Sequence, residues 1–341
     1  MTDWAALGAW MAGALDLPSP VAVEVVGGPA STGYSAETVV FDAAGRRWVL
    51  RAETPDPPIY PVQVEGMAVE IEVQWRVMSA LAGAVPVARI LGGSLDPGVI
   101  GTPFFVMEFV EGVVPAVDPP YTAAGFFVSA AADERTAMLT DGLRVLARLH
   151  GLDWQSAGLS WLVPPGVAPT MERQLDVWEA YSRAELGPRR HELLDRAWDV
   201  LHRHLPAGGA PGLCWGDPRP GNMIWSSFRC VCMTDFEAAA IAPPEMDLGW
   251  WLMFERTCHE VAGVPRLPGE PSREEQAAIY GEAVGRDVGD THIHEVFAAA
   301  RYCGIVVRVM NRTVARGLMP ADHTVWRDNP ASTALAQLLD G

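Results

Sequence analysis

Three polar residues lie close together in one stretch of the sequence, at spacings that suit the transfer of a phosphoryl group. Asp217 lies in a loop rich in glycine and proline, Asn222 follows five residues later, and Asp235 ends the next predicted strand. In phosphoryl transfer, one carboxylate orients the attacking hydroxyl, while an amide oxygen and a second carboxylate hold Mg²⁺ between the nucleotide phosphates. We therefore predict Asp217 as the base and Asn222 with Asp235 as the metal ligands. Each of them taken alone would be explained more simply as a turn residue.

The basic residues narrow the chemistry further, because all 25 of them are arginines and none is a lysine. A P-loop needs a lysine on its phosphates, and pyridoxal-phosphate or Schiff-base enzymes need one as a nucleophile, so these classes are excluded. Any cationic role must fall to a guanidinium group, which stays charged and binds phosphate as a planar fork.

The composition is that of an ordinary globular protein whose 341 residues allow two lobes. The formal net charge of −17 repels a nucleic-acid backbone, so we expect no nucleic-acid partner. This charge suits a cationic substrate, or it serves only solubility. No apolar run approaches the roughly 18 residues of a membrane span, and the first residues lack the basic start of a signal peptide. We expect a cytoplasmic enzyme with no membrane partner; the sequence indicates no oligomeric state.

The candidate residues must be positioned by two regions of different character. Up to residue 110 the sequence predicts a hairpin around Gly45, a helix over 67–81 and a strong strand over 104–110. A proline-rich linker over 111–120 follows, and beyond it we predict helices and one strand island over 212–237. The helices are expected over 141–150, 171–184, 191–205 and 296–314, with a capping box at Ser272 opening another. We expect a ligand in the cleft between a small α+β lobe and a larger helical lobe.

Several segments together resemble the aminoglycoside phosphotransferase and choline kinase-like superfamily. Gly216-Asp217-Pro218-Arg219-Pro220-Gly221-Asn222 resembles its H-G-D-x-x-x-x-N catalytic loop, and Asp235-Phe236-Glu237 resembles its counterpart of the protein-kinase D-F-G motif. Phe104 to Gly112 is similar to the hinge between the lobes, and Pro243 to Gly249 is similar to the segment that supports the catalytic loop. The pattern is most similar to the branch found as the kinase-like domain of acyl-CoA-dehydrogenase fusions.

The resemblance implies a protein-kinase-like, two-lobed α+β fold. Residues 1–110 would form a nucleotide-binding lobe with an antiparallel sheet and a helix, and residues 111–341 a mostly helical catalytic and substrate-binding lobe with a catalytic hairpin. It also implies that ATP (or GTP) with Mg²⁺ donates a phosphoryl group to the hydroxyl of a small molecule. Asp247 would accept hydrogen bonds from the catalytic loop, with Trp215 and Glu237 as further supporting residues.

The resemblance also implies where the nucleotide would bind. Arg51, at the end of a predicted strand, would hold the α- and β-phosphates, although the sequence alone also allows a surface arginine there. The adenine would hydrogen-bond backbone groups of Glu108, Phe109 and Val110. Backbone amides of a turn would cradle phosphate oxygens, an arrangement that an ordinary hairpin turn explains equally well. This turn consists of Ser31, Thr32, Gly33, Tyr34 and Ser35.

Three positions depart from the family pattern. Trp215 stands where the family has the histidine of its catalytic loop, and Arg51 stands in the cation position. The helix position that usually supplies a glutamate to pair with this cation holds Gln74, which cannot form an ion pair. Glu70, one turn earlier on the same face, is a candidate replacement. These departures also allow an alternative, a nucleotide-binding pseudokinase or regulatory module without efficient transfer.

The acceptor side is less clearly encoded. Arg219, two residues after the predicted base, would stabilise charge on the transferred phosphoryl group or contact an anionic substrate, unless it is a plain surface residue. The acidic balance suits an aminoglycoside or amino alcohol, whereas the family branch suggests a hydroxyacyl-CoA or another hydroxylated metabolite. Aromatic residues in the predicted acceptor region, such as Tyr121 and Trp251, disfavour a purely polycationic ligand.

Overall fold

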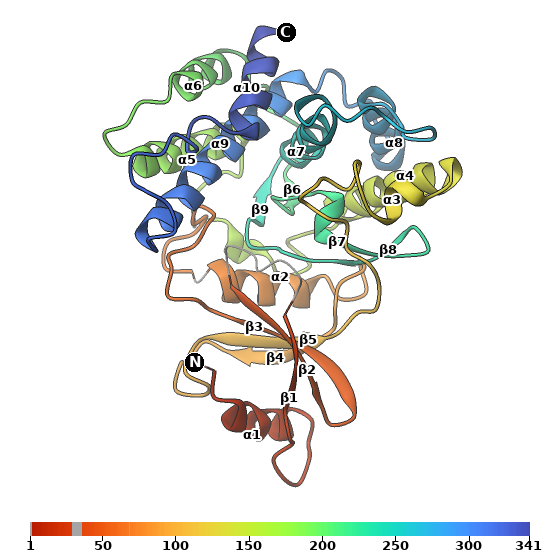
Figure 1. Cartoon of the computed structure of the whole chain (residues 1–341), viewed down its shortest axis with the longest axis vertical. Coiled ribbons are helices and arrows are strands. Elements are labelled where there is room, and N and C mark those ends of the chain that lie inside the picture. Colours follow the sequence, from red (N-terminus) through yellow and green to blue (C-terminus); the bar gives the residue numbers. More distant parts are fainter. Residues whose placement is uncertain (1, 29–35, 68) are drawn as a thin grey trace.

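A computed structural model of the chain describes residues 2–28, 36–67 and 69–341. Its N-terminal part is built on a five-stranded antiparallel sheet with the strand order β1-β2-β3-β5-β4 (Figure 1). The strands are β1 (Glu24–Gly27), β2 (Glu37–Ala43), β3 (Arg46–Ala52), β4 (Ile90–Ser94) and β5 (Phe104–Glu108). The predicted hairpin around Gly45 is confirmed as the β2–β3 turn, where Ala44 and Gly45 have φ values of 51° and 71°. Positive φ at both turn residues matches the right-handed twist of the two strands.

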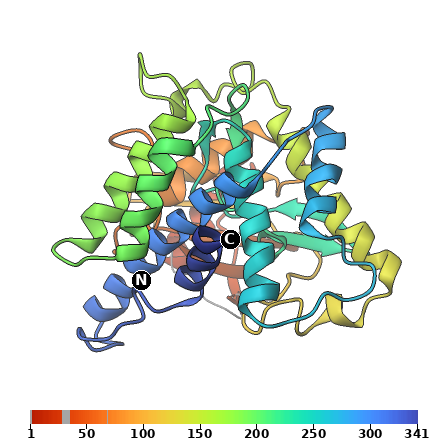
Figure 2. The ribbon, with the colours of Figure 1, turned by 90° about the horizontal axis from the view of Figure 1, so that it is seen from above.

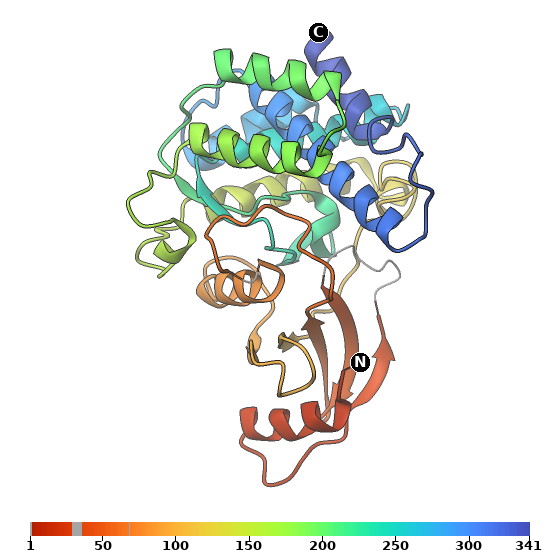
Figure 3. The ribbon, with the colours of Figure 1, turned by 90° about the vertical axis from the view of Figure 1, so that its left-hand side faces the viewer.

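The two faces of this sheet are covered by different helices. Helix α1 (Trp4–Ala14) packs Leu7 and Met11 against one face, with Trp48 of β3 beneath them. Helix α2 (Gln74–Ala80) packs against the other face, where Phe105 belongs to the same core cluster as its apolar residues. Figure 3 shows α1 below the sheet and α2 between the sheet and the rest of the chain. The predicted helix over 67–81 is therefore present, although a π-helical turn (Val69–Val73) precedes α2.

The C-terminal part is mostly helical, as predicted, and Figure 2 shows its helices stacked over the sheet in the view from above. The helices are α3 (Phe126–Ser129), α4 (Ala132–His150), α5 (Met171–Leu186), α6 (Glu192–His204), α7 (Glu245–Arg256), α8 (Arg273–Val284), α9 (His292–Ala315) and α10 (Pro330–Asp340). The predicted capping box is confirmed at the start of α8, where Ser272 and Glu275 bond each other's backbone amides. Among the described residues, no helix is long and apolar enough to cross a membrane.

The predicted strand island is confirmed and divides into two small antiparallel sheets. Strand β6 (Gly212–Cys214) pairs with β9 (Ala240–Ala242), and β7 (Met223–Ser226) pairs with β8 (Arg229–Met233). All of β6 and β9 is buried, as are Met223 and Trp225 of β7. The loops at the ends of these strands carry the three predicted catalytic and metal-binding residues, so a rigid, buried scaffold positions them.

One predicted helix boundary was wrong. The helix expected over 141–150 begins much earlier, because α4 starts at Ala132. Its N-terminus lacks the serine, threonine, asparagine or aspartate that usually marks a start. Instead, the Glu134 carboxylate accepts a hydrogen bond from the Ala131 amide at 2.8 Å, which stabilises the first turn from inside the helix.

Candidate active site

The loop between β6 and β7 holds Asp217 in a dense hydrogen-bond shell. Its side chain is almost fully buried, and four groups donate to the carboxylate: Asn222 Nδ2 at 2.8 Å, Trp250 Nε1 at 2.7 Å, Tyr60 OH at 3.2 Å and Arg219 Nε at 3.1 and 3.2 Å. A carboxylate offers about four lone-pair positions, so these donors fill the group. The predicted base is therefore held in one orientation, and an acceptor hydroxyl must displace one of the donors to reach it.

The backbone of this loop is fixed from below by Asp247 of α7. The two Asp247 carboxylate oxygens accept hydrogen bonds from the amides of Trp215 at 2.6 Å and Gly216 at 3.0 Å, which is the contact predicted for this residue. Gly216 has a φ of 91°, and a Cβ there would lie 2.2 Å from the Ala238 carbonyl oxygen. Only glycine fits this close approach, so the local sequence and the fold specify the loop together.

Arg301 of α9 supports the same loop from the helical core, and the sequence analysis missed it. It is fully buried between the rings of Trp178 and Trp250, each 4.5 Å from the guanidinium carbon. Its Nη2 donates to the Gly216 carbonyl oxygen at 2.8 Å. Burial lowers the pKa of Arg301 to about 10, so it is still charged at neutral pH. The signal that could have found it is a single charged residue, Arg301, within the otherwise apolar run of 296–307.

Asn222 and Asp235 are brought together by the backbone around them. The amide and hydroxyl of Thr234 both donate to the Asn222 carbonyl oxygen at 2.9 Å, and the Trp215 indole donates to the carbonyl oxygen of Asp235 at 3.1 Å. Asp235 has a φ of 64°, a left-handed conformation that is uncommon for a residue other than glycine. Trp215 therefore links the catalytic loop to Asp235 through its indole nitrogen, in the position where the family has histidine.

The chemistry of this pair fits a divalent cation. Burial raises the pKa of Asp235, the Arg51 guanidinium lowers it, and the nearby Asp217 carboxylate raises it again. The Asp235 Oδ1 atom is buried, and the described residues offer it no hydrogen-bond partner. A hard cation with oxygen ligands would satisfy this atom and offset the repulsion between the two carboxylates.

Arg51 of β3 lies beside Asp235 and is paired with Glu237. Its Nη2 donates to Glu237 Oε1 at 2.7 Å and lies 3.7 Å from Asp235 Oδ1, while its Nη1 donates to Thr38 Oγ1 at 2.6 Å. Gln74 donates to the same Glu237 oxygen at 2.9 Å. The carboxylate in direct contact with Arg51 is therefore that of Glu237, two residues after Asp235, and not that of the candidate Glu70.

Glu70 instead faces the C-terminal helices. It is 3% exposed, and its Oε1 lies 3.6 Å from a guanidinium nitrogen of Arg312 on α9. Burial raises the pKa of Glu70 to about 7, against the opposing effects of Arg312 and Arg51. The π-helical turn that carries Glu70 changes the helical phase relative to α2, which is why the simple one-turn spacing from Gln74 failed.

The predicted adenine site lies at the end of β5, where two backbone amides already donate hydrogen bonds to other parts of the protein. The Glu108 amide donates to the Arg89 carbonyl oxygen at 2.9 Å, and the Phe109 amide donates to the Arg47 carbonyl oxygen at 3.2 Å. Val110 follows directly after these two residues, beyond the end of β5. The turn predicted to cradle phosphates, Ser31 to Ser35, lies outside the described residues.

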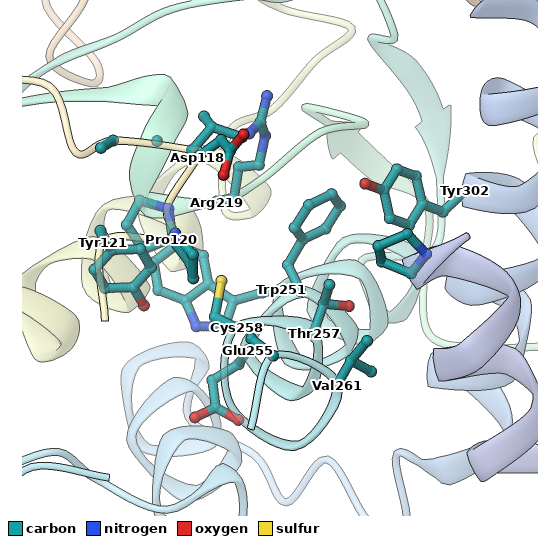
Figure 4. A pocket seen from close by; sticks show the side chains of 17 residues that line it. Asp118, Pro120, Tyr121, Arg219, Trp251, Glu255, Thr257, Cys258, Val261 and Tyr302 are labelled. Atoms are coloured by element: carbon teal, nitrogen blue, oxygen red, sulfur yellow. The ribbon is translucent and has the colours of Figure 1, made fainter. Parts of the chain in front are cut away.

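A cavity of about 400 Å³ opens beside the catalytic loop, on the side of Arg219 (Figure 4). Arg219 and Asp118 lie together at one end, and Glu255 lies at the other. The lining is mainly apolar or aromatic and includes Val117, Pro120, Tyr121, Trp251, Phe254, Cys258, Val261 and Tyr302. Asp217 is not among the described residues that line the cavity. Arg219 lines the cavity and bonds the Asp217 carboxylate, so the Arg219 side chain lies between the cavity and that carboxylate.

A match to a protein-family model shows to which family the chain belongs. The model described as "Phosphotransferase enzyme family" matches residues 27–287. The chain belongs to this phosphotransferase family. This confirms the resemblance read from the motifs, and the two-lobed kinase-like fold predicted with it.

The chain is also similar to individual proteins, both in sequence and in structure. Acyl-CoA dehydrogenase family member 10 of Mus musculus is 29% identical over 228 residues, which make up 64% of this chain and 19% of that protein. The chain thus spans about a fifth of this relative. A provisionally named aminoglycoside phosphotransferase from Ralstonia eutropha is similar in structure, with a TM-score of 0.75, 26% identity, and coverage of 99% of this chain and 97% of the other. The GDP and kanamycin complex of APH(2″)-IIIa has a TM-score of 0.57 at 17% identity, with coverage of 95% and 94%, and shows the shared fold.

Proposed function

We propose that this phosphotransferase uses ATP (or GTP) and Mg²⁺ to phosphorylate a hydroxyl group of a small molecule. Residues 1–110 would bind the nucleotide, and residues 111–341 would supply catalysis and the acceptor site. The observation that carries the proposal is the joint placement of Asp217, Asn222 and Asp235 on two loops that the backbone ties together. These are the groups that in-line transfer between a nucleotide and an alcohol requires.

In this proposal each residue has a separate task. Asp217 accepts a hydrogen bond from the acceptor hydroxyl and takes up its proton as the oxygen attacks the γ-phosphorus, while the bond from this phosphorus to the β–γ bridging oxygen breaks and the nucleoside diphosphate leaves. Arg51, oriented by Thr38 and Glu237, presents its guanidinium group to the α- and β-phosphates. Asn222 and Asp235 would hold the Mg²⁺, which when bound neutralises charge on the phosphates. The protein therefore acts mainly by positioning groups and by stabilising charge.

Arg219 gives the acceptor its route to Asp217. Its Nε holds both carboxylate oxygens, while its guanidinium carbon lies 5.3 Å from the centre of the Phe254 ring at the cavity. Among the donors to Asp217, Arg219 is the one that lines the cavity, so we infer that the acceptor hydroxyl takes its place. The displaced guanidinium group would then be free to contact the transferred phosphoryl group.

The cavity favours an acceptor with an apolar body over a polycation. Two of the described residues in its lining carry carboxylates, Glu255 and Asp118. The Glu255 carboxylate is already bound by both terminal nitrogens of Arg266, one of them at 2.8 Å, and a guanidinium nitrogen of Arg273 lies 3.5 Å from it. Asp118 is exposed at the rim. An aminoglycoside or amino alcohol would find little further negative charge, whereas a hydroxyacyl thioester or similar hydroxylated metabolite would bury its chain against aromatic residues.

A specific observation also supports the alternative of a nucleotide-binding module without efficient transfer. All the acceptor positions of Asp217 are filled in this structure, and Gln74 replaces the charged partner expected for Arg51. If the Arg219 contact does not open, Mg-ATP would bind without turnover.

A screen with γ-labelled ATP separates these functions. We expect Mg-ATP to raise the melting temperature, and label to enter a hydroxyacyl thioester or another apolar alcohol rather than an aminoglycoside. Stabilisation by Mg-ATP with no labelled product across hydroxyacyl thioesters, sugars, amino alcohols and aminoglycosides would favour the alternative. No response to any nucleotide would reject both.

A further inference from the structure

The segment that follows β3 crosses from the sheet to the helical lobe, and we call residues 53–64 the strap. Figure 3 shows it running along the underside of the helical lobe before the chain enters α2. Three arginines at the end of α9, two within the helix and one directly after it, are spaced four residues apart and therefore lie on one face, and they bind the strap. Arg308 donates to the Pro58 carbonyl oxygen at 3.0 and 3.1 Å, Arg312 donates to the Pro57 carbonyl oxygen, and Arg316 pairs with Asp56.

A further anchor holds the strap at the neighbouring residue. The Tyr181 hydroxyl of α5 donates to the carbonyl oxygen of Ile59, and the Ile59 side chain is buried in the core of the helical lobe. Arg308 is itself fixed by Glu185 of α5 at 2.8 Å. The strap is therefore bound through the backbone carbonyls of three consecutive residues, Pro57 to Ile59, and through the Asp56 side chain before them, which sets the position of the next side chain, Tyr60.

Tyr60 brings a hydroxyl from the strap to the catalytic carboxylate. Its OH donates to Asp217 Oδ2 at 3.2 Å, on the same oxygen that accepts from Asn222. Burial raises the pKa of Tyr60 well above its ordinary value, and the Asp217 charge raises it further. The hydroxyl thus keeps its proton near neutral pH and acts as a donor.

The four donors to Asp217 do not have the same origin. Asn222, Arg219 and Trp250 all belong to the helical lobe, whereas Tyr60 comes from the segment between β3 and α2. If Arg219 gives way to the acceptor, Trp250 remains on Oδ1, and Asn222 and Tyr60 remain on Oδ2. The geometry points to Tyr60 as a positioning residue that fixes Asp217 for catalysis, delivered by a strap that binds the sheet region to α9. This inference rests on the proposed phosphotransferase function.

The test compares Tyr60→Phe with Tyr181→Phe. Both substitutions remove one hydroxyl bond next to the same part of the strap, but only the first removes a donor from Asp217. We expect Tyr60→Phe to lower kcat about tenfold, the effect of losing one hydrogen bond to a charged group, with KM for ATP within twofold of wild type. Tyr181→Phe should change kcat less than threefold at a similar melting temperature.

A double-variant cycle supplies the second readout. If Tyr60 acts through Asp217, then adding Tyr60→Phe to Asp217→Asn should change the residual single-turnover rate by less than twofold. Wild-type kcat in Tyr60→Phe, equal losses in the two tyrosine variants, or a full tenfold further loss in the double variant would each overturn the inference. A wild-type protein that transfers no phosphoryl group would instead reject the proposed function on which it rests.

Discussion

The catalytic loop and the cation site lie side by side, but they are held together over very different distances in the sequence. Asp217 bonds Arg219 and Asn222, which are 2 and 5 residues away, and Trp250, which is 33 residues away. Arg51 bonds Glu237 across 186 residues, and Gln74 reaches the same carboxylate across 163. Apart from Tyr60, which reaches Asp217 across 157 residues, one side of the site is therefore encoded within a short stretch of sequence, and the other is assembled only when the two lobes meet.

The difference is clearest in how the charge of Arg51 is balanced. The helix position holds an amide, and the carboxylate that balances Arg51 stands at Glu237, beside Asp235. Gln74 then serves as a donor to Glu237 instead of as an ion-pair partner. A remote partner can be exchanged in this way, whereas the local geometry of the catalytic loop leaves little room for substitution.

The largest effect should come from Asp235, the proposed metal ligand that joins the two regions. Asp235→Asn is expected to lower kcat about 10³-fold, because it removes a ligand that would hold charge on the phosphates. The neutral side chain no longer repels Asp217, so the melting temperature without nucleotide should not fall. Steady-state kinetics would measure the loss of kcat, and differential scanning fluorimetry with and without Mg-ATP would measure the melting temperature and its increase on binding. A variant that keeps its Mg-ATP stabilisation would show that Asp235 does not bind the metal.

The next effect tests the cation side. Arg51→Ala should lower kcat/KM for ATP about 100-fold, the loss expected from removing one charged donor at the phosphates. Arg51→Lys keeps the charge but cannot bond Thr38 and Glu237 as a fork, so a loss of about tenfold is expected. Steady-state kinetics with varied ATP would measure both. Full activity in Arg51→Lys would show that only the charge matters.

A smaller effect is expected when the carboxylate and the amide that meet at Arg51 are exchanged between positions 74 and 237. Gln74→Glu restores the charge that is usual at this helix position, yet here it places a carboxylate against Glu237. We expect a loss of roughly 1–3 kcal/mol in the free energy of unfolding and no gain in activity. The double variant Gln74→Glu/Glu237→Gln moves the carboxylate to the helix and should recover most of the stability in urea unfolding. If Gln74→Glu alone is more active than wild type, the assignment of Glu237 as partner is incorrect.

A last effect, on stability alone, concerns Glu70, whose carboxylate lies beside Arg312 of α9 rather than at the cation site. Its carboxyl ionises near 4.5 in an unfolded chain but at about 7 in the fold, so the native state binds the extra proton between these values. Stability from this group therefore falls as pH rises from about 4.5 to 7, by at most about 3 kcal/mol. Glu70→Gln should match wild type at pH 5 and exceed it at pH 8 in thermal unfolding. Equal pH profiles for the two proteins would contradict the raised pKa.

The sequence predicted the elements whose signals are local. The hairpin at Gly45, the strand island and the capping box at Ser272 depend on turn residues, alternation and a short spacing, and all are present. The start of α4 was missed because its capping group is a glutamate inside the helix rather than a residue before it.

The contacts of the site divide in the same way. The Asp217 and Asp235 loops could be placed from their motifs, and Asp247 makes the contact expected of it. Glu237 as the partner of Arg51, and Tyr60 as a donor to Asp217, depend on how distant segments pack. No local spacing encodes those two contacts.

The measurement that tests the account most directly is the transfer of the γ-phosphoryl group from labelled ATP to an apolar alcohol by wild type and Asp217→Asn in parallel. Asparagine keeps the shape of the side chain but cannot accept the proton. We predict labelled phosphate ester with wild type, and a rate about 10³-fold lower with Asp217→Asn at unchanged Mg-ATP stabilisation. Equal rates in the two proteins would contradict the assignment of Asp217 as the base.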